Sequence, residues 1–172
     1  MKNVIISFLA LLPLPVALLV GSRQPDKPSA ANNPDQSKPF RIFNPDTIAK
    51  PAAGYSHVAE VTGGKLVYIA GQVALDRSGN LVGKDDFRAQ VQQVFENIKA
   101  AVEATGGDTH SIIKLNYYCA EKVDPAQTPV VREIRDKYVD TANPPTSTFV
   151  VVSRLVRPEW LIEVDVVAVV PK

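Results

Sequence analysis

Apolar residues recur at steps of three and four in two segments of the chain, and this spacing predicts two amphipathic helices. The longer stripe consists of Phe87, Val91, Val94, Phe95, Ile98 and Val102. Asp85 and Asp86 precede it and suit the positive end of a helix, and the glycine pair at 106–107 ends it. The shorter stripe follows the helix-start signal Thr128-Pro129 and consists of Val130, Val131, Ile134 and Tyr138.

Runs of β-branched and apolar residues surround these helices and predict strands. They cover residues 55–61, 65–73, 111–119, 149–155 and 161–170. Gly71 interrupts the second run, which is typical of a β-bulge or of a close approach to the backbone. Turn signals at 62–64 and 76–80, with a return beginning at Leu81 and Val82, predict an antiparallel meander in the first third of the domain.

The order of these elements predicts an α+β fold with a mixed sheet and both helices on one face. In the last run, one face carries Ile162, Val164, Val166 and Ala168, and the other carries Leu161, Glu163, Asp165 and Val167. Both faces therefore hold apolar residues. Because no further helices are available to cover the second face, we expect another subunit to pack there.

The first 39 residues differ from the rest. Lys2 precedes an uncharged apolar run from Val4 to Gly21, which is interrupted by Pro13 and Pro15. We expect residues 1–22 to be an export signal, with an uncleaved membrane anchor as the alternative. Residues 23–39 have the composition of a flexible linker, and residues 40–172 form the folded domain. Both alternatives predict an exported domain, periplasmic or secreted. Contact with a membrane is expected only through the N-terminal segment, if that segment is uncleaved.

Composition narrows the possible partners and cofactors. The 172 residues carry a formal net charge of +1 without a basic block, so a nucleic-acid partner is not expected. A single cysteine excludes an intrachain disulfide, and Cys119 is expected to be a small buried hydrophobic residue. His57 and His110 are far apart and belong to no metal-binding pattern, so no metal site is predicted.

Four sequence motifs, taken in their order along the chain, resemble those of a known family. They are GYSHVAEV at 54–61, IAGQVALDRSGNLVG at 69–83, ATGG at 104–107 and PPTSTFVVVSRLVRPEWLIEVDVVAV at 144–169. Together they resemble the RidA/YjgF/UK114 family of enamine and imine deaminases over nearly all of residues 40–172. The resemblance implies a chorismate-mutase-like α+β fold and a homotrimer with pockets between subunits. It also implies hydrolysis of 2-imino or 2-enamino acids to 2-keto acids and ammonia, with no metal or organic cofactor.

The resemblance also assigns roles to individual residues. Glu163 matches the glutamate that orders the attacking water, and Gly71 matches the glycine whose backbone lines the cleft. Tyr55 matches a tyrosine that the neighbouring subunit contributes to the pocket wall. Phe149 stands where active members often have cysteine, and its backbone carbonyl could accept a hydrogen bond from an imine N–H.

One expected residue is missing. The family's arginine, which grips the substrate carboxylate, aligns with Ser147, or with Thr146 if there is a gap. Thr146, Ser147 and Thr148 therefore occupy the anion-binding corner without a cation, and losing a charge-assisted hydrogen bond costs about 1–3 kcal/mol. Less direct candidates for the cation are Arg132, Arg135 and Arg154.

Two functions remain open from the sequence. The first is a hydrolase of small reactive enamines or imines, with altered or reduced activity on 2-imino acids. The alternative is a non-catalytic trimer of the same fold that binds a small molecule. A nuclease is the weakest hypothesis, because the sequence has no basic stripe.

Overall fold

The computed structural model of the chain describes residues 38–52 and 54–172. The predicted export signal and nearly all of the predicted linker lie outside these residues. Within the described part, no helix combines the length and the apolar character needed to cross a bilayer.

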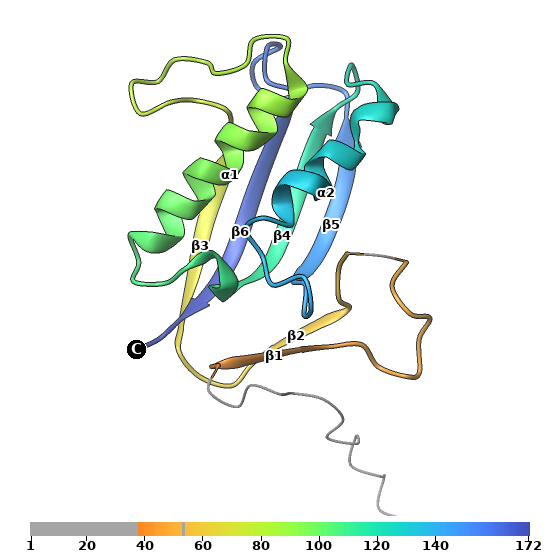
Figure 1. Cartoon of the computed structure of the whole chain (residues 1–172), viewed down its shortest axis with the longest axis vertical. Helices are drawn as coiled ribbons and strands as arrows, with labels where there is room; N and C mark the ends of the chain where they lie inside the picture. The colour runs from red at the N-terminus through yellow and green to blue at the C-terminus, as the bar shows by residue number, and fades with distance from the viewer. Residues whose placement is uncertain (1–37, 53) are drawn as a thin grey trace, which may run out of the picture. The chain divides into compact units, whose positions relative to one another are not determined.

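The described residues form a mixed four-stranded sheet, a two-stranded ribbon and two α-helices (Figure 1). The strands are β1 (Phe40–Phe43), β2 (Val58–Val61), β3 (Lys65–Gln72), β4 (Ile112–Ala120), β5 (Thr146–Val152) and β6 (Ile162–Val170). The helices are α1 (Phe87–Glu103) and α2 (Pro129–Arg135), with short 3-10 turns at Thr109–Ser111 and Pro125–Gln127. The sheet order is β3-β6-β4-β5, in which β4 and β5 run parallel and the other pairs are antiparallel. The predicted α+β class and mixed sheet are confirmed.

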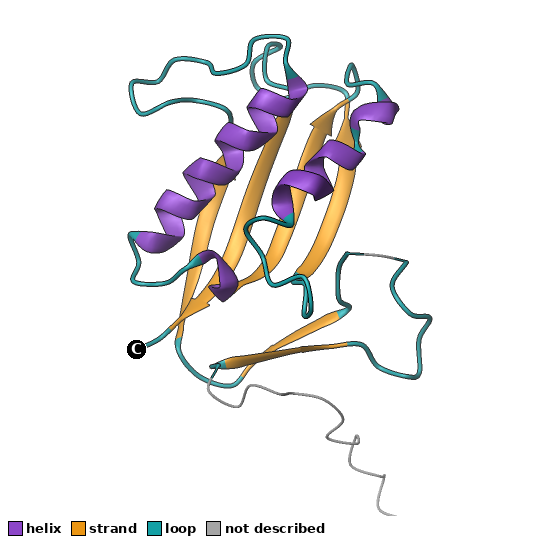
Figure 2. Ribbon diagram, viewed as in Figure 1, coloured by secondary structure: helices purple, strands orange, loops and turns teal. Residues whose placement is uncertain are grey.

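Both α-helices lie on the same face of the four-stranded sheet (Figure 2). The apolar stripe of α1 is buried as its spacing predicts, and the side chain of Asp86 caps the helix by accepting from the backbone N–H of Ala89 at 3.0 Å. Beneath the helices, β6 contributes Ile162, Val164 and Val166 to the main core. We call this the helix-covered face of the sheet.

Among the residues that the structure describes, only one end of the opposite face, which we call the open face, is covered. Phe40 of β1 packs there with Ile113 and Val169 in a second, smaller apolar cluster. Elsewhere on the described chain large apolar side chains remain exposed, with Leu66 46% and Tyr68 78% accessible on β3. The open face thus combines an apolar surface with the polar side of β6.

Three details of the strand predictions are wrong. The first third of the domain is not a meander, because β2 pairs with β1 and β3 pairs with β6. Strand β1 was not predicted, and the expected return after residue 80 is reduced to a single bridge between Leu75 and Leu81. Alternation shows that a segment is extended, but it does not identify the strand with which the segment pairs.

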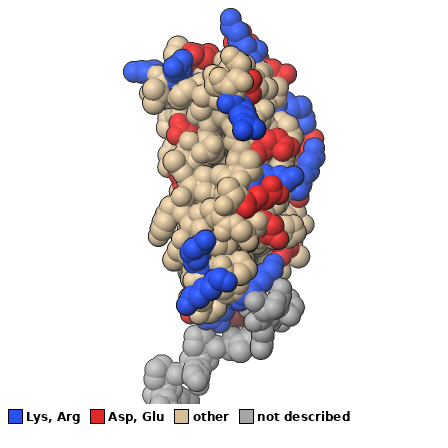
Figure 3. Space-filling view, turned by 90° about the vertical axis from the view of Figure 1, so that its left-hand side faces the viewer, with Lys and Arg blue, Asp and Glu red and all other residues tan. Residues whose placement is uncertain are grey.

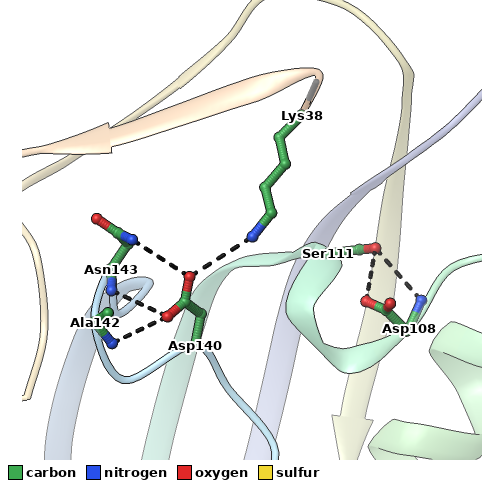
Figure 4. A network of polar contacts seen from close by, with 6 residues as sticks. All are labelled: Lys38, Asp108, Ser111, Asp140, Ala142 and Asn143. Carbon is green, nitrogen blue, oxygen red and sulfur yellow. Dashed lines mark hydrogen bonds and ion pairs between the residues drawn. The ribbon is translucent and has the colours of Figure 1, made fainter. Parts of the chain in front are cut away.

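A polar contact links the start of the described chain to the loop before β5 (Figure 4). Lys38 lies 3.6 Å from the carboxylate of Asp140. That carboxylate also accepts hydrogen bonds from the backbone N–H groups of Ala142 at 3.0 Å and Asn143 at 3.3 Å. These contacts constrain the loop leading into β5 around Asp140.

Candidate functional site

Gly71 and Glu163 lie in direct contact on the open face. Between Ile69 and Gln72 the register of β3 against β6 shifts by one residue, so Gly71 lies in a β-bulge. A Cβ atom added to Gly71 would fall 1.9 Å from Oε1 of Glu163 and 2.7 Å from its carboxyl carbon. The carboxylate therefore fills the space that the missing side chain leaves, and a larger residue at position 71 would displace it.

The surroundings of Glu163 favour its protonated form. The side chain is half-buried, and this burial raises the pKa of its carboxyl above the ordinary value of 4.5. The nearby charge of Asp165, two residues along the same strand, raises it further. An acid of this kind can exchange a proton with a reacting group closer to neutral pH than an ordinary glutamate can.

Asp165 is held by neighbours on β4 that sequence reasoning did not single out. Its carboxylate accepts a hydrogen bond from Nδ2 of Asn116 at 2.8 Å. Hydrogen bonding to Asp165, together with its charge and that of Glu163, raises the pKa of the Tyr118 hydroxyl. The alternation of Lys114, Asn116 and Tyr118 along β4 was a signal that could have placed these side chains on the open face.

The start of β5 forms a second group of predicted residues. The backbone N–H of Ser56 donates to the carbonyl of Pro145 at 3.3 Å, and Ser56 forms a parallel bridge with Thr146. The hydroxyl of Thr146 donates to the carbonyl of Ile113 at 2.9 Å. Its hydroxyl is therefore already engaged with β4.

Ser147 and Thr148 point to opposite faces of the sheet. Thr148 pairs with Asn116, which itself pairs with Asp165, so it lies on the open face. Ser147 pairs with the buried Leu115 and lies on the helix-covered face. Only one of the two hydroxyls thus shares a face with Glu163.

The aromatic residues of the predicted site lie near this second group. Phe149 stacks on Tyr117, with ring centroids 5.6 Å apart. Tyr55 immediately precedes Ser56 and meets the ring of His57 edge to face at 5.6 Å. Nε2 of His57 lies 2.8 Å from the carbonyl of Ala49, which holds the loop in place.

The predicted residues therefore form two groups within one chain. Gly71 and Glu163 are adjacent, whereas Tyr55, Ser147 and Phe149 gather at the start of β5. Ser147 and Glu163 are two strands apart and three residues out of register, which corresponds to roughly 14 Å between their Cα atoms. A small substrate cannot contact both groups of the same chain.

The cations considered from the sequence lie in different places. Nη1 of Arg154 faces the carbonyls of Leu155 at 3.4 Å and Val156 at 3.5 Å, within its own loop. Arg135 is buried and donates to the carbonyl of Gly54, next to Tyr55. Arg135 follows Val131 by four residues and so lies on the buried side of α2.

Other parts of the described chain give weaker evidence for a functional site. Burial raises the pKa of the Cys119 thiol, which makes it a poor nucleophile. Across residues 38–52 and 54–172 no group of three His, Cys, Asp or Glu side chains could hold a metal ion. A surface hollow of about 440 Å³ lies in the loop between β1 and β2, away from Glu163. Its lining residues are Asn44, Pro45, Asp46, Ile48, Lys50 and Pro51.

The sheet, its single helical layer and the bulge-held carboxylate define an α+β protein of the Rid type. The family model described as endoribonuclease L-PSP matches residues 47–170. A RutC family protein from Pyrococcus horikoshii is 34% identical over 123 residues, which make up 72% of this chain and 92% of that protein. The chain therefore belongs to the family described as endoribonuclease L-PSP.

Further relatives agree with this assignment. The solved structure of YyfB, a Rid family protein of unknown function from Yersinia pestis, is 34% identical with a TM-score of 0.70. The match covers 77% of this chain and 100% of that one. A 2-iminobutanoate/2-iminopropanoate deaminase from Dermatophagoides farinae is 28% identical over 110 residues, or 64% of this chain and 82% of that protein.

Proposed function

We propose that this protein hydrolyses small reactive imines or enamines to a carbonyl compound and ammonia. The contact between Gly71 and Glu163 is the observation that supports this proposal most, because it fixes a proton-exchanging carboxylate at a defined position. One relative is named as a 2-iminobutanoate/2-iminopropanoate deaminase, which supports the same chemistry.

Glu163 has two roles in the proposed reaction. Its ionised carboxylate accepts a proton from water as the water oxygen bonds to the imine carbon, and it passes that proton to the imine nitrogen to give a neutral carbinolamine. The carboxylate then takes the proton of the carbinolamine hydroxyl and delivers it to the nitrogen as the C–N bond breaks and the C=O bond forms. One water is consumed, and one carbonyl compound and one ammonia are formed. A raised pKa suits both steps, because the group must accept and release the proton in turn.

The proposed pocket lies between subunits of a homotrimer. In one chain the Glu163 group and the β5-start group are too far apart for one small ligand, so the start of β5 of one subunit would face the open face of another. The exposed apolar side chains of Leu66 and Tyr68 support such a contact, because burial of apolar surface stabilises association. Tyr55 and the backbone of Phe149 would then meet the substrate beside the neighbour's Glu163.

Ser147 alters the expected substrate preference. Its hydroxyl offers a neutral hydrogen bond where the family resemblance leads us to expect a guanidinium. We therefore expect weaker binding of 2-imino acids through this strand than a β5 arginine would give. A non-catalytic binding trimer remains the alternative function.

An RNA substrate, as the family's description suggests, has less support. The chain carries a formal net charge of +1, and the face in Figure 3 shows acidic and basic side chains close together. Phosphate backbones require a concentrated positive surface. The acids Glu163 and Asp165 on the open face act against such binding.

The test is the decay of 2-iminobutanoate generated by an amino acid oxidase and trapped with semicarbazide. The wild-type protein should accelerate the decay, and Glu163→Ala should reduce the acceleration roughly 100- to 10,000-fold. Glu103→Gln, an exposed acid on α1, is the matched control and should leave the rate unchanged. A wild-type rate equal to that of buffer, for this imine and for one without a carboxylate, would favour the binding alternative.

A further inference from the structure

Two arginines on α2 lie against the loop that carries Tyr55. Nη1 of Arg135 donates to the carbonyl of Gly54, and its Nε donates to Asp136 at 2.8 Å. Its side chain is 6% exposed, so these bonds are shielded from water. Arg135 thus fastens the loop to the helix.

Arg132 is placed differently. Its side chain is 57% exposed, and its Nε lies 3.6 Å from Oδ2 of Asp136. A Cβ atom at Gly54 would fall 3.1 Å from this Nε, and Gly54 has a positive φ of 69° that other residues rarely adopt. The absence of a side chain at position 54 therefore leaves the guanidinium directly beside the loop backbone.

The charges of this corner do not balance. Nη2 of Arg135 is 2.6 Å from Oδ1 of Asp136, and Arg132 shares the same carboxylate. Two guanidinium groups with one carboxylate have a combined charge of +1. By comparison, Arg88 on α1 makes two hydrogen bonds to Glu133, at 2.8 and 2.7 Å, so each positive charge there has its own negative partner.

This charge lies near the start of β5. Gly54 is two residues before Ser56, which bridges to Thr146. Burial raises the pKa of the Tyr117 hydroxyl, and the neighbouring guanidinium of Arg135 partly opposes this effect. The ring of Tyr117 stacks on Phe149. Arg132 and Arg135 therefore lie near the start of β5, on its helix-covered side.

We infer that Arg132 binds the carboxylate of small anionic ligands at this corner, in place of the arginine that β5 lacks at Ser147. This inference rests on the proposed function only for the identity of the ligand, a 2-imino acid or its 2-keto acid product. Arg135 is a positioning residue, which holds Gly54 and Asp136 so that Arg132 lies at the start of β5. Binding from an exposed side chain would be salt-sensitive, because mobile ions screen it.

The experiment measures binding of 2-oxobutanoate to the full chain by calorimetry at low and high salt. Arg132→Gln should weaken binding roughly three- to tenfold, and Arg132→Lys should recover part of it, because lysine keeps the charge without the planar fork. Arg88→Gln is the matched control, since Arg88 is 54% exposed and also paired with an acid of α2, and it should bind like wild type. Ser147→Arg added to Arg132→Gln should restore affinity.

Three outcomes would overturn the inference. They are wild-type affinity in Arg132→Gln, an equal loss in Arg88→Gln, or no binding of 2-oxobutanoate by the wild-type protein. A separate readout keeps the proposed function distinguishable. If a neutral imine formed by an amine oxidase is hydrolysed but 2-oxobutanoate does not bind, the inference is wrong and the proposed function stands. If 2-oxobutanoate binds through Arg132 but neither imine is hydrolysed, the inference about Arg132 stands and the proposed function is wrong.

Discussion

The two groups of candidate residues use their polar atoms in different ways. On the open face, the backbone makes room for a carboxylate, because Gly71 has no side chain and lies in a bulge beside Glu163. At the start of β5, polar atoms bind one another, as Thr146 does with the carbonyl of Ile113 and Arg135 with that of Gly54. In the function proposed above, the first group exchanges protons, whereas the second holds the local structure and presents one exposed cation.

The largest effect should come from changing the first group alone. Gly71→Ala places a methyl group where the carboxylate of Glu163 lies, so the carboxylate must move. Misplacing a catalytic group by about 1 Å lowers rates by up to roughly 100-fold, and we expect a 10- to 100-fold loss of imine hydrolysis. Gly63→Ala is the matched control, because its Cβ would meet only Pro39, at 3.9 Å. Equal rates for Gly71→Ala and wild type would contradict the role of the bulge.

Changing the second group should affect stability more than the proton-transfer chemistry. Arg135→Met removes hydrogen bonds from a buried guanidinium, and we expect the free energy of unfolding to fall by about 1.5–3 kcal/mol. Arg132→Met removes an exposed, more distant ion pair and should lower it by less than about 1 kcal/mol. Urea denaturation of both variants measures the difference. A larger loss for Arg132→Met would show that the two arginines have been assigned the wrong roles.

A smaller, pH-dependent effect is expected in the loop that leads to the second group. Burial acts to raise the pKa of Asp140, in the loop before β5, but hydrogen bonds from Asn143 and Ala142 and the charge of Lys38 outweigh it and lower the pKa below 3.8. The ionised form is therefore favoured in the folded state. Its contribution is present above pH 3.8 and is lost as the pH falls through the folded-state pKa.

Asp140→Asn tests this sign directly. The variant should be less stable than wild type at neutral pH, and the difference should shrink as the pH falls below 3.8. Urea midpoints at a series of pH values measure it. A difference that grows on acidification would mean that Asp140 is destabilised by its surroundings.

The sequence predicted the positions of the helices and strands better than it predicted which strands pair. Helical spacing identified the buried stripe of α1, and alternation along β6 placed Glu163 and Val164 on opposite faces, because side-chain direction follows local periodicity. The pairing of β1 with β2 was not predictable in this way, since four-residue strands carry little pattern and the Gly63-Gly64 turn also fits a hairpin.

The candidate site was predictable only in part. Residues 71 and 163 were assigned through the family resemblance, and their contact depends on a bulge that spacing alone does not locate in three dimensions. The contact of Arg135 with Gly54 joins residues 81 positions apart, so no local pattern contains it. The position of Ser147 on the opposite face from Thr148 follows from alternation, but which face holds the helices follows from packing.

The most direct measurement is a carbon-13 NMR titration of the Glu163 carboxyl in the intact protein. Burial and the charge of Asp165 predict a midpoint above 4.5 and a lower midpoint in Asp165→Asn. A midpoint at or below 4.5 in the wild-type protein would contradict the claim that burial and Asp165 prepare this acid for proton exchange.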